Sequence, residues 1–119
     1  MPVRNVVVAQ HDPKSAEALA SILDRHFRSV RLARSLDEVK SAIPKLRAEV
    51  AVVDLEMVPL AEVEKLSREY HVPIICTHRV PDEEMWTAAL SAGAVDCCQS
   101  TDVQSIVSAL DAMSSAKAA

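Results

Sequence analysis

The chain has 119 residues, half of them hydrophobic, and a formal net charge of −4 from 13 basic and 17 acidic residues. A chain of this length forms one domain with its own core, so residues 1–119 are expected to fold as a single unit. The charged residues are scattered along the sequence, which argues against direct nucleic-acid binding, because that needs a concentrated basic surface. No apolar run approaches the roughly 20 residues that span a bilayer, and no signal-peptide pattern opens the chain. We therefore expect a cytoplasmic protein that makes no membrane contact.

The three cysteines, Cys76, Cys97 and Cys98, match neither a CxxC motif nor a zinc-binding spacing. With no export signal, they are expected to be reduced thiols in the core. Successive side chains of a strand leave opposite faces, so Cys97 and Cys98 are not expected to form a disulfide.

Five short apolar runs recur along the chain and predict five strands. Most of the runs are continuously apolar rather than alternating, which is typical of strands covered on both faces, as in a parallel sheet. The runs are residues 3–9, 30–33, 49–54, 72–77 and 93–98.

A helical pattern follows each of these runs. Asp12 and Pro13 supply an N-cap and a first-turn proline for the first helix. The apolar stripe of that helix is Ala16, Leu19, Ile22, Leu23 and Phe27.

The other four helices have start or stop signals of their own. The capping box "SLDE" (35–38) opens the second, and the third is expected from Pro59 to about Tyr70. The fourth should run from about Pro81 to Ala92 and end at Gly93, the only glycine, in a left-handed conformation. The segment "TDVQ" (101–104) can cap the fifth.

A strand followed by a helix, repeated five times, predicts a doubly wound α/β fold with right-handed crossovers. The simplest fit is a flavodoxin-like (βα)5 three-layer sandwich, whose five-stranded parallel sheet has the order 2-1-3-4-5. Binding sites in such sheets form outside the carboxyl ends of the strands. The residues expected there are Gln10, His11, Asp54, Thr77, His78, Gln99 and Ser100.

Four segments, taken in chain order, resemble the landmarks of the response-regulator receiver domain of two-component signalling. They are "VVVAQHDPKSAEAL", "AVVDLEM", "PIICT" and "SAGAVDCCQST", and the resemblance extends from residue 3 to about residue 113. It implies that Asp54 holds the position that accepts a phosphoryl group from a histidine kinase. It likewise implies that Thr77 holds the position of the switch hydroxyl, and Gly93 matches the glycine that opens the fifth strand.

The chain departs from the family pattern at the positions that bind metal and phosphoryl oxygen. With Pro13 set on the family's proline, the metal-binding acidic pair falls on Gln10 and His11. Asp12 then falls on the third, less critical acidic position. The family's invariant lysine falls on Ser100.

These departures predict a degenerate site. Magnesium needs hard oxygen ligands, typically carboxylates, whereas Gln10 offers an amide oxygen and His11 a nitrogen suited to transition metals. We therefore expect a pseudo-receiver without a cofactor, which acts by protein–protein contact and not as an enzyme, with impaired magnesium-dependent phosphorylation of Asp54. The alternative is a genuine phospho-accepting receiver, whose rearranged magnesium site uses Asp12.

His11, Asp54 and His78 could also converge at the rim of the sheet as a zinc site. The three residues come from separate loops and match no metal motif. We therefore favour the interpretation in which His78 is an exposed loop residue and His11 only fills a vacated acidic position.

Two residues are candidates for contact with partners. Trp86, on the fourth helix, belongs either to the core or to the face made by helix four, strand five and helix five, which receivers use for dimers and partners. Cys97 falls at the family's switch aromatic and borders this face. The expected partners are signalling proteins, a histidine kinase or another regulator, with a possible homodimer through this face.

Overall fold

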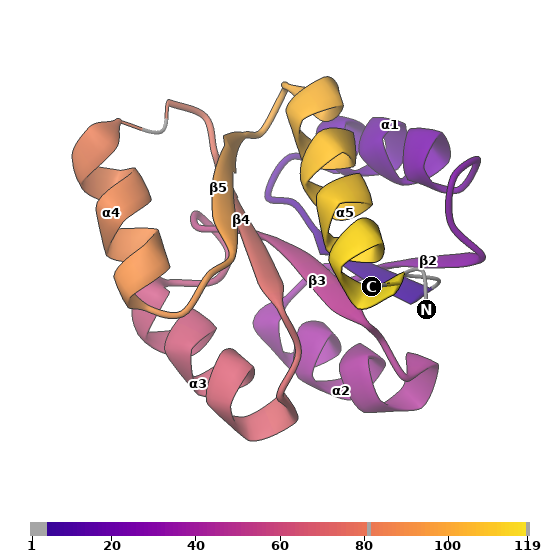
Figure 1. The fold of residues 1–119 in the computed structure, drawn as a ribbon, viewed down its shortest axis with the longest axis horizontal. Helices are drawn as coiled ribbons and strands as arrows, with labels where there is room; N and C mark the ends of the chain where they lie inside the picture. The colour runs from indigo at the N-terminus through magenta and orange to yellow at the C-terminus, as the bar shows by residue number, and fades with distance from the viewer. Residues whose placement is uncertain (1–4, 81, 119) are drawn as a thin grey trace.

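The computed structural model describes residues 5–80 and 82–118, with side chains up to residue 113. Five parallel strands form one sheet in the order β2-β1-β3-β4-β5, and a helix follows each strand (Figure 1). The strands are β1 (Asn5–Ala9), β2 (Ser29–Leu32), β3 (Val50–Asp54), β4 (Ile74–His78) and β5 (Asp96–Gln99). The helices are α1 (Pro13–Leu23), α2 (Leu36–Leu46), α3 (Leu60–Tyr70), α4 (Glu83–Ser91) and α5 (Val103–Ala118). The predicted flavodoxin-like fold and strand order are confirmed.

The continuous valine runs of β1 and β3 explain why these strands lie in the middle of the sheet. Val6, Val7 and Val8 are fully buried, because helices cover both faces. Val7 packs on the side of α2, α3 and α4, and its neighbours Val6 and Val8 pack on the side of α1 and α5. The same separation of the helices into two layers is visible in Figure 1.

Side-chain caps fix the starts of the helices where the sequence predicts them. Asp12 Oδ2 accepts from Ser15 N at 3.2 Å and opens α1. Ser35, Asp82 and Asp102 accept in the same way from the amide three residues ahead, at the starts of α2, α4 and α5. Because Asp82 is the cap, α4 begins at Glu83.

The predicted boundaries differ from the observed ones at a few positions. Helix α1 ends at Leu23, and Phe27 is buried from the turn that follows rather than from the helix. The amides of Arg25 and His26 reach back only three residues, to Ile22 and Leu23, which tightens the last turn and ends the helix. The predicted starts at residues 3 and 81 lie outside the described residues.

Gly93 links α4 to β5 with φ of +100°. This is the left-handed region that residues with a Cβ avoid. A Cβ at this position would also lie 3.4 Å from Ser67 Oγ. The predicted helix-ending role of the glycine is confirmed.

Within residues 5–80 and 82–118, no helix has both the length and the apolar character that crossing a membrane requires.

The three cysteines are buried and free. Cys97 faces the layer of α2, α3 and α4, and Cys98 faces that of α1 and α5, as expected for neighbours in a strand. Burial raises the pKa of Cys76 and of Cys98 to about 12, from an ordinary 9.0. A thiolate is the reactive form of cysteine, so these thiols are structural.

The raised pKa values predict a loss of stability at high pH. The folded state keeps Cys76 and Cys98 protonated up to about pH 12, whereas the unfolded chain releases both protons near pH 9.0. The free energy of unfolding should therefore fall as pH rises from about 9 towards 12. Urea denaturation should show a shallower fall in a Cys76→Ala/Cys98→Ala variant, and equal slopes would contradict the assignment.

Candidate functional site

The carboxyl ends of the strands open into a cleft of about 380 Å³. It lies above β1, β3 and β5, where the topology of the sheet predicts a site. Its lining residues are Gln10, His11, Asp12, Ser15, Asp54, Glu56, Arg79, Ser100 and Thr101. The structure thus brings together five of the residues singled out from the sequence: Gln10, His11, Asp12, Asp54 and Ser100.

Asp54 ends β3 and is 4% exposed. One carboxylate oxygen accepts from the backbone N–H of His11 at 3.0 Å, and the other accepts from the backbone N–H of Glu56 at 2.9 Å. Two loops, one after β1 and one after β3, therefore hold this carboxylate in place. Charge-assisted hydrogen bonds of this kind are stronger than neutral ones.

Gln10 and Thr77 form a buried pair beside Asp54. The Gln10 Nε2 donates to Thr77 Oγ1 at 2.9 Å, and the Thr77 hydroxyl lies 3.3 Å from the Gln10 Oε1 that can accept from it. Gln10 is 4% exposed and Thr77 is fully buried. Each side chain thereby gives the other a hydrogen-bond partner, as buried polar groups require. The Thr77 hydroxyl, at the predicted switch position, is hydrogen-bonded to the Gln10 amide.

Ser100 follows β5 and is 8% exposed. Its backbone N–H donates to the carbonyl of His78 at 2.9 Å, which fixes its place at the floor of the cleft. Its Oγ has no hydrogen-bond partner among the described residues. Buried hydroxyls are nearly always paired, so this oxygen is an exception among the described residues.

Sequence reasoning missed an ion pair at the mouth of the cleft. Arg79 Nε lies 2.6 Å from Glu56 Oε1, and Gln99 Nε2 donates to the Arg79 carbonyl at 3.1 Å. Their positions in the sequence could have indicated this contact, because Glu56 and Arg79 each lie within two residues of the carboxyl end of a strand. Arg79 is the cleft's only arginine or lysine among the residues that line it.

The three residues considered for a zinc site do not come together. His78 turns to its own loop, where its Nδ1 accepts from the backbone N–H of Val80 at 3.1 Å. In the part of the chain that the structure describes, no three His, Cys, Asp or Glu side chains are placed to hold a metal ion. His78 therefore lies apart from the cleft that His11 and Asp54 line.

Asp12 is committed to capping α1. Its Oδ2 accepts from both the N–H and the hydroxyl of Ser15, at 3.2 and 2.8 Å. The hydrogen bond from the Ser15 hydroxyl is the main cause that lowers the pKa of Asp12, and the bond from the Ser15 N–H acts in the same direction. The Asp12 carboxylate borders the same cleft as Asp54, but its Oδ2 already accepts two hydrogen bonds from Ser15.

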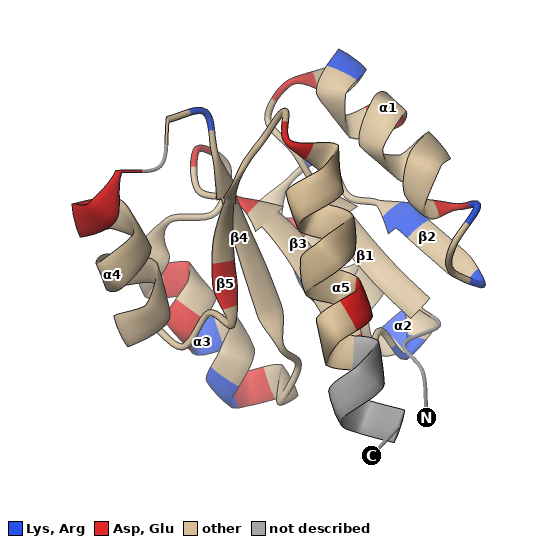
Figure 2. Ribbon diagram, turned by 45° about the horizontal axis from the view of Figure 1, so that its top comes forward, with Lys and Arg blue, Asp and Glu red and all other residues tan. Residues whose placement is uncertain are grey.

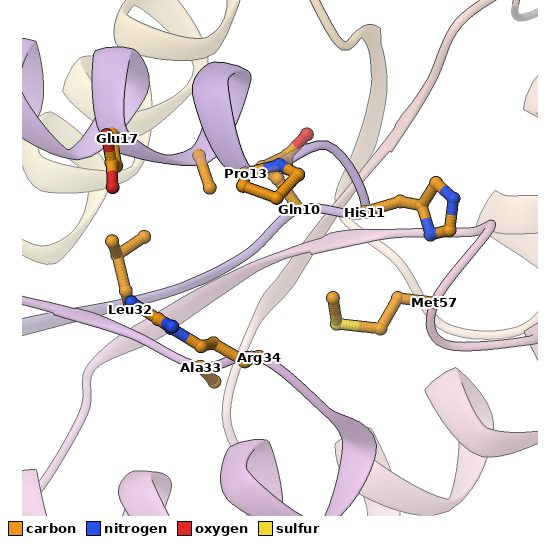
Figure 3. A pocket seen from close by; sticks show the side chains of 9 residues that line it. Gln10, His11, Pro13, Glu17, Leu32, Ala33, Arg34 and Met57 are labelled. Atoms are coloured by element: carbon orange, nitrogen blue, oxygen red, sulfur yellow. The ribbon is translucent and has the colours of Figure 1, made fainter.

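A second, smaller pocket of about 190 Å³ lies on the other side of the loop between β1 and α1 (Figure 3). Its walls come from the start of α1, the end of β2 and Met57 (Figure 3). The lining residues are Gln10, His11, Pro13, Ala16, Glu17, Leu32, Ala33, Arg34 and Met57. Gln10 and His11 therefore form part of the wall of both cavities.

Of the two candidate contact residues, only Trp86 lies at the surface. It is 44% exposed, and its Nε1 donates to Asp96 Oδ1 at 3.4 Å. Cys97 is 8% exposed and packs in the core. The proposed contact role of Cys97 is therefore corrected, because its position in β5 points the side chain at the helix layer.

Solved structures with the same fold are response-regulator receivers. The receiver domain of the Francisella response regulator 1452 superposes with a TM-score of 0.84 at 17% identity, covering 96% of this chain and 98% of that one. The BeF3-activated N-terminal receiver domain of Klebsiella pneumoniae RstA gives 0.81 at 17% identity, with 93% and 97% covered. A Burkholderia pseudomallei response regulator with a phosphorylated aspartic acid, a calcium ion and citrate gives 0.79 at 24% identity, with 94% and 69% covered.

No family model matches the sequence, and no curated protein matches it significantly. The structural likenesses, all at or below 24% identity among these three, establish the fold. The chain has the receiver fold of response regulators.

The buried pair makes a prediction about stability. Thr77→Val leaves the Gln10 amide buried without its partner, and Gln10→Leu leaves the Thr77 hydroxyl only the longer hydrogen bond to the Val53 carbonyl at 3.5 Å. Each should lower the free energy of unfolding by about 1–3 kcal/mol. The double variant should lose less than the sum of the two, because it buries no orphaned group. Urea denaturation of the four proteins measures this coupling, and strictly additive losses would contradict the contact.

Proposed function

We propose that this domain is a receiver of two-component signalling in which magnesium-dependent phosphorylation of Asp54 is impaired, so that it acts through protein–protein contacts. The observation that carries the proposal is the buried hydrogen bond between Gln10 and Thr77. Gln10 stands where a receiver needs a metal-binding carboxylate, and its amide occupies the hydroxyl that would turn to a phosphoryl group.

The donor set around Asp54 does not fit magnesium. This ion needs several hard oxygen ligands in near-ideal octahedral geometry. The Asp54 carboxylate accepts two backbone N–H groups, and the Gln10 amide oxygen lies against Thr77. His11 offers a nitrogen on an exposed side chain. We therefore expect the domain to act without a cofactor.

The cation that stabilises a transferring phosphoryl group is also missing from the expected position. Phosphoryl transfer depends on positive charge placed where negative charge spreads in the transition state. Ser100 is too short and uncharged to supply it, and Arg79 is held by Glu56 at the mouth of the cleft. The uncharged Ser100 and the ion-paired Arg79 both support slow or absent phosphorylation of Asp54. They favour a domain that binds partners over one that acts as an enzyme.

A phospho-accepting receiver remains the second candidate, because Asp12 and Asp54 border the same cleft. In this candidate Asp12 would leave Ser15 and take a place beside a magnesium ion. The cap at the start of α1 would be lost in the process, at a cost of about 1 kcal/mol. In either case the partners proposed are signalling proteins, a histidine kinase or another regulator.

Incubation with acetyl phosphate and Mg²⁺, followed by intact-mass measurement, tests the proposal. The wild-type protein should gain no phosphoryl group on the time scale of ordinary receivers. A variant with Gln10→Asp, His11→Asp and Ser100→Lys should gain one, because it restores the carboxylates and the cation that the chemistry requires.

Two controls complete this experiment. Adding Asp54→Asn to the restored variant should abolish the gain in mass, which assigns the phosphoryl group to Asp54. Prompt and stoichiometric phosphorylation of the wild-type protein, lost on Asp12→Ala, would instead support the second candidate.

A further inference from the structure

The charged residues, which look scattered along the sequence, divide between the two parts of the chain. Residues 1–79 hold twelve basic and eleven acidic residues, a net charge of +1, whereas residues 80–119 hold one basic and six acidic residues, a net charge of −5. No Lys, Arg or His occurs between residues 80 and 116. An asymmetry of this kind indicates a charged partner surface.

The acidic residues gather around α4 and β5, at one edge of the sheet. Glu83 and Glu84 are exposed in the first turn of α4 and form no ion pair within the described residues. Exposed apolar side chains surround them: Val80 is 74% exposed and Trp86 is 44% exposed. Figure 2 shows the acidic start of α4 at the outer side of the molecule. We call this surface, with Asp82 and Asp96, the acidic face.

The opposite edge of the sheet carries arginines at every third residue. Arg25, Arg28, Arg31 and Arg34 run through the turn before β2, the strand itself and the segment after it, and all four are exposed. None of the four forms an ion pair with another described residue. β2 has a neighbouring strand on one side only, and Figure 2 shows its basic residue on the side away from α4. We call this surface the basic edge.

The basic edge is hollowed on both sides of β2. The two shallow depressions measure about 420 and 270 Å³, and Arg31, Leu32 and Arg34 line both of them. Asp24 borders one depression, and Glu38 borders the other, so the rim is not wholly basic. Leu32 lies in both depressions, and Arg31 and Arg34 give them a charge opposite in sign to that of Glu83 and Glu84.

We propose that the basic edge of one copy of this chain docks on the acidic face of a second copy, head to tail. Two exposed surfaces whose arginines and glutamates form no ion pairs within the described residues are thereby matched by charge, and no group foreign to the chain is needed. The possible homodimer through α4, β5 and α5 is disfavoured, because a symmetric contact there would set acids against acids. A signalling role for this contact rests on the proposed function. The contact itself does not depend on the chemistry at Asp54.

A head-to-tail contact leaves one free surface at each end, so further copies add until the rotation between copies closes a ring, or an open chain forms where it does not close. Because exposed charges drive it, salt should weaken it. The contact therefore predicts a mass that rises with protein concentration at low salt and falls to that of the monomer at high salt.

Sedimentation equilibrium of two variants tests the contact. The edge variant carries Arg28→Gln, Arg31→Gln and Arg34→Gln, and the face variant carries Glu83→Lys and Glu84→Lys. Each alone should be monomeric at low salt, because one of its two surfaces is lost. An equimolar mixture should form a one-to-one dimer and stop there, since the edge variant keeps the acidic face and the face variant keeps the basic edge.

A matched control removes three basic residues elsewhere, through Lys14→Gln, Lys65→Gln and Arg68→Gln, and should associate like the wild type. Circular dichroism confirms that each variant is folded. Wild-type protein that stays monomeric at every concentration would overturn the proposal. The acidic face would then be assigned to binding a basic segment of another protein. Self-association of the edge variant alone would overturn it in favour of a symmetric dimer. Phosphorylation of Asp54 in any of these proteins would bear on the proposed function and not on this contact.

Discussion

The hydrogen bond between the Gln10 amide and the Thr77 hydroxyl spans the end of β3 from one neighbouring strand to the other. Because β1 and β4 flank β3, the bond lies beside Asp54, the proposed phosphoacceptor position. It is buried, and a buried amide that loses its partner costs about 1–3 kcal/mol. The loop after β1, which also donates to Asp54 through the His11 N–H, is held in place by this bond. Gln10 therefore fixes the part of the cleft that lies between β1 and Asp54.

The parallel sheet explains why substitutions far apart in the sequence act on one place. In β3 and β4 the register sets Asp54 opposite Thr77, and β5 delivers Ser100 to the same edge of the sheet. The amide of Gln10 and the hydroxyl of Ser100, at the positions that the receiver resemblance gives to a carboxylate and to a cation, thus lie in the same cleft. The proposed loss of magnesium chemistry and the proposed role in protein contacts are two consequences of this shared position.

Much of the fold could be predicted from the sequence, because continuous valine runs, caps and the single glycine each act locally. The position of Asp54 followed from the same pattern. The contact of Gln10 with Thr77 could not be predicted, since it depends on how far two side chains reach across a strand that separates them. The pairing of Arg79 with Glu56 depends on the shapes of the loops after two neighbouring strands, β3 and β4, which the sequence pattern does not fix. The charge separation was missed because residues 25–34 and 80–96 reach opposite edges only through the strand order.

We propose that the carboxylate of Asp54 lies in a cleft in which a fixed hydrogen-bond network takes the place of metal ligands. Titration with Mg²⁺, followed in ¹H–¹⁵N spectra, tests this most directly, because the N–H groups of His11 and Glu56 donate to the two Asp54 oxygens. Neither resonance should move in the wild-type protein, whereas the N–H resonances of residue 11 and of Glu56 should both move in a variant with Gln10→Asp and His11→Asp. Saturable shifts of both resonances in the wild type, lost on Asp54→Ala, would contradict the proposal.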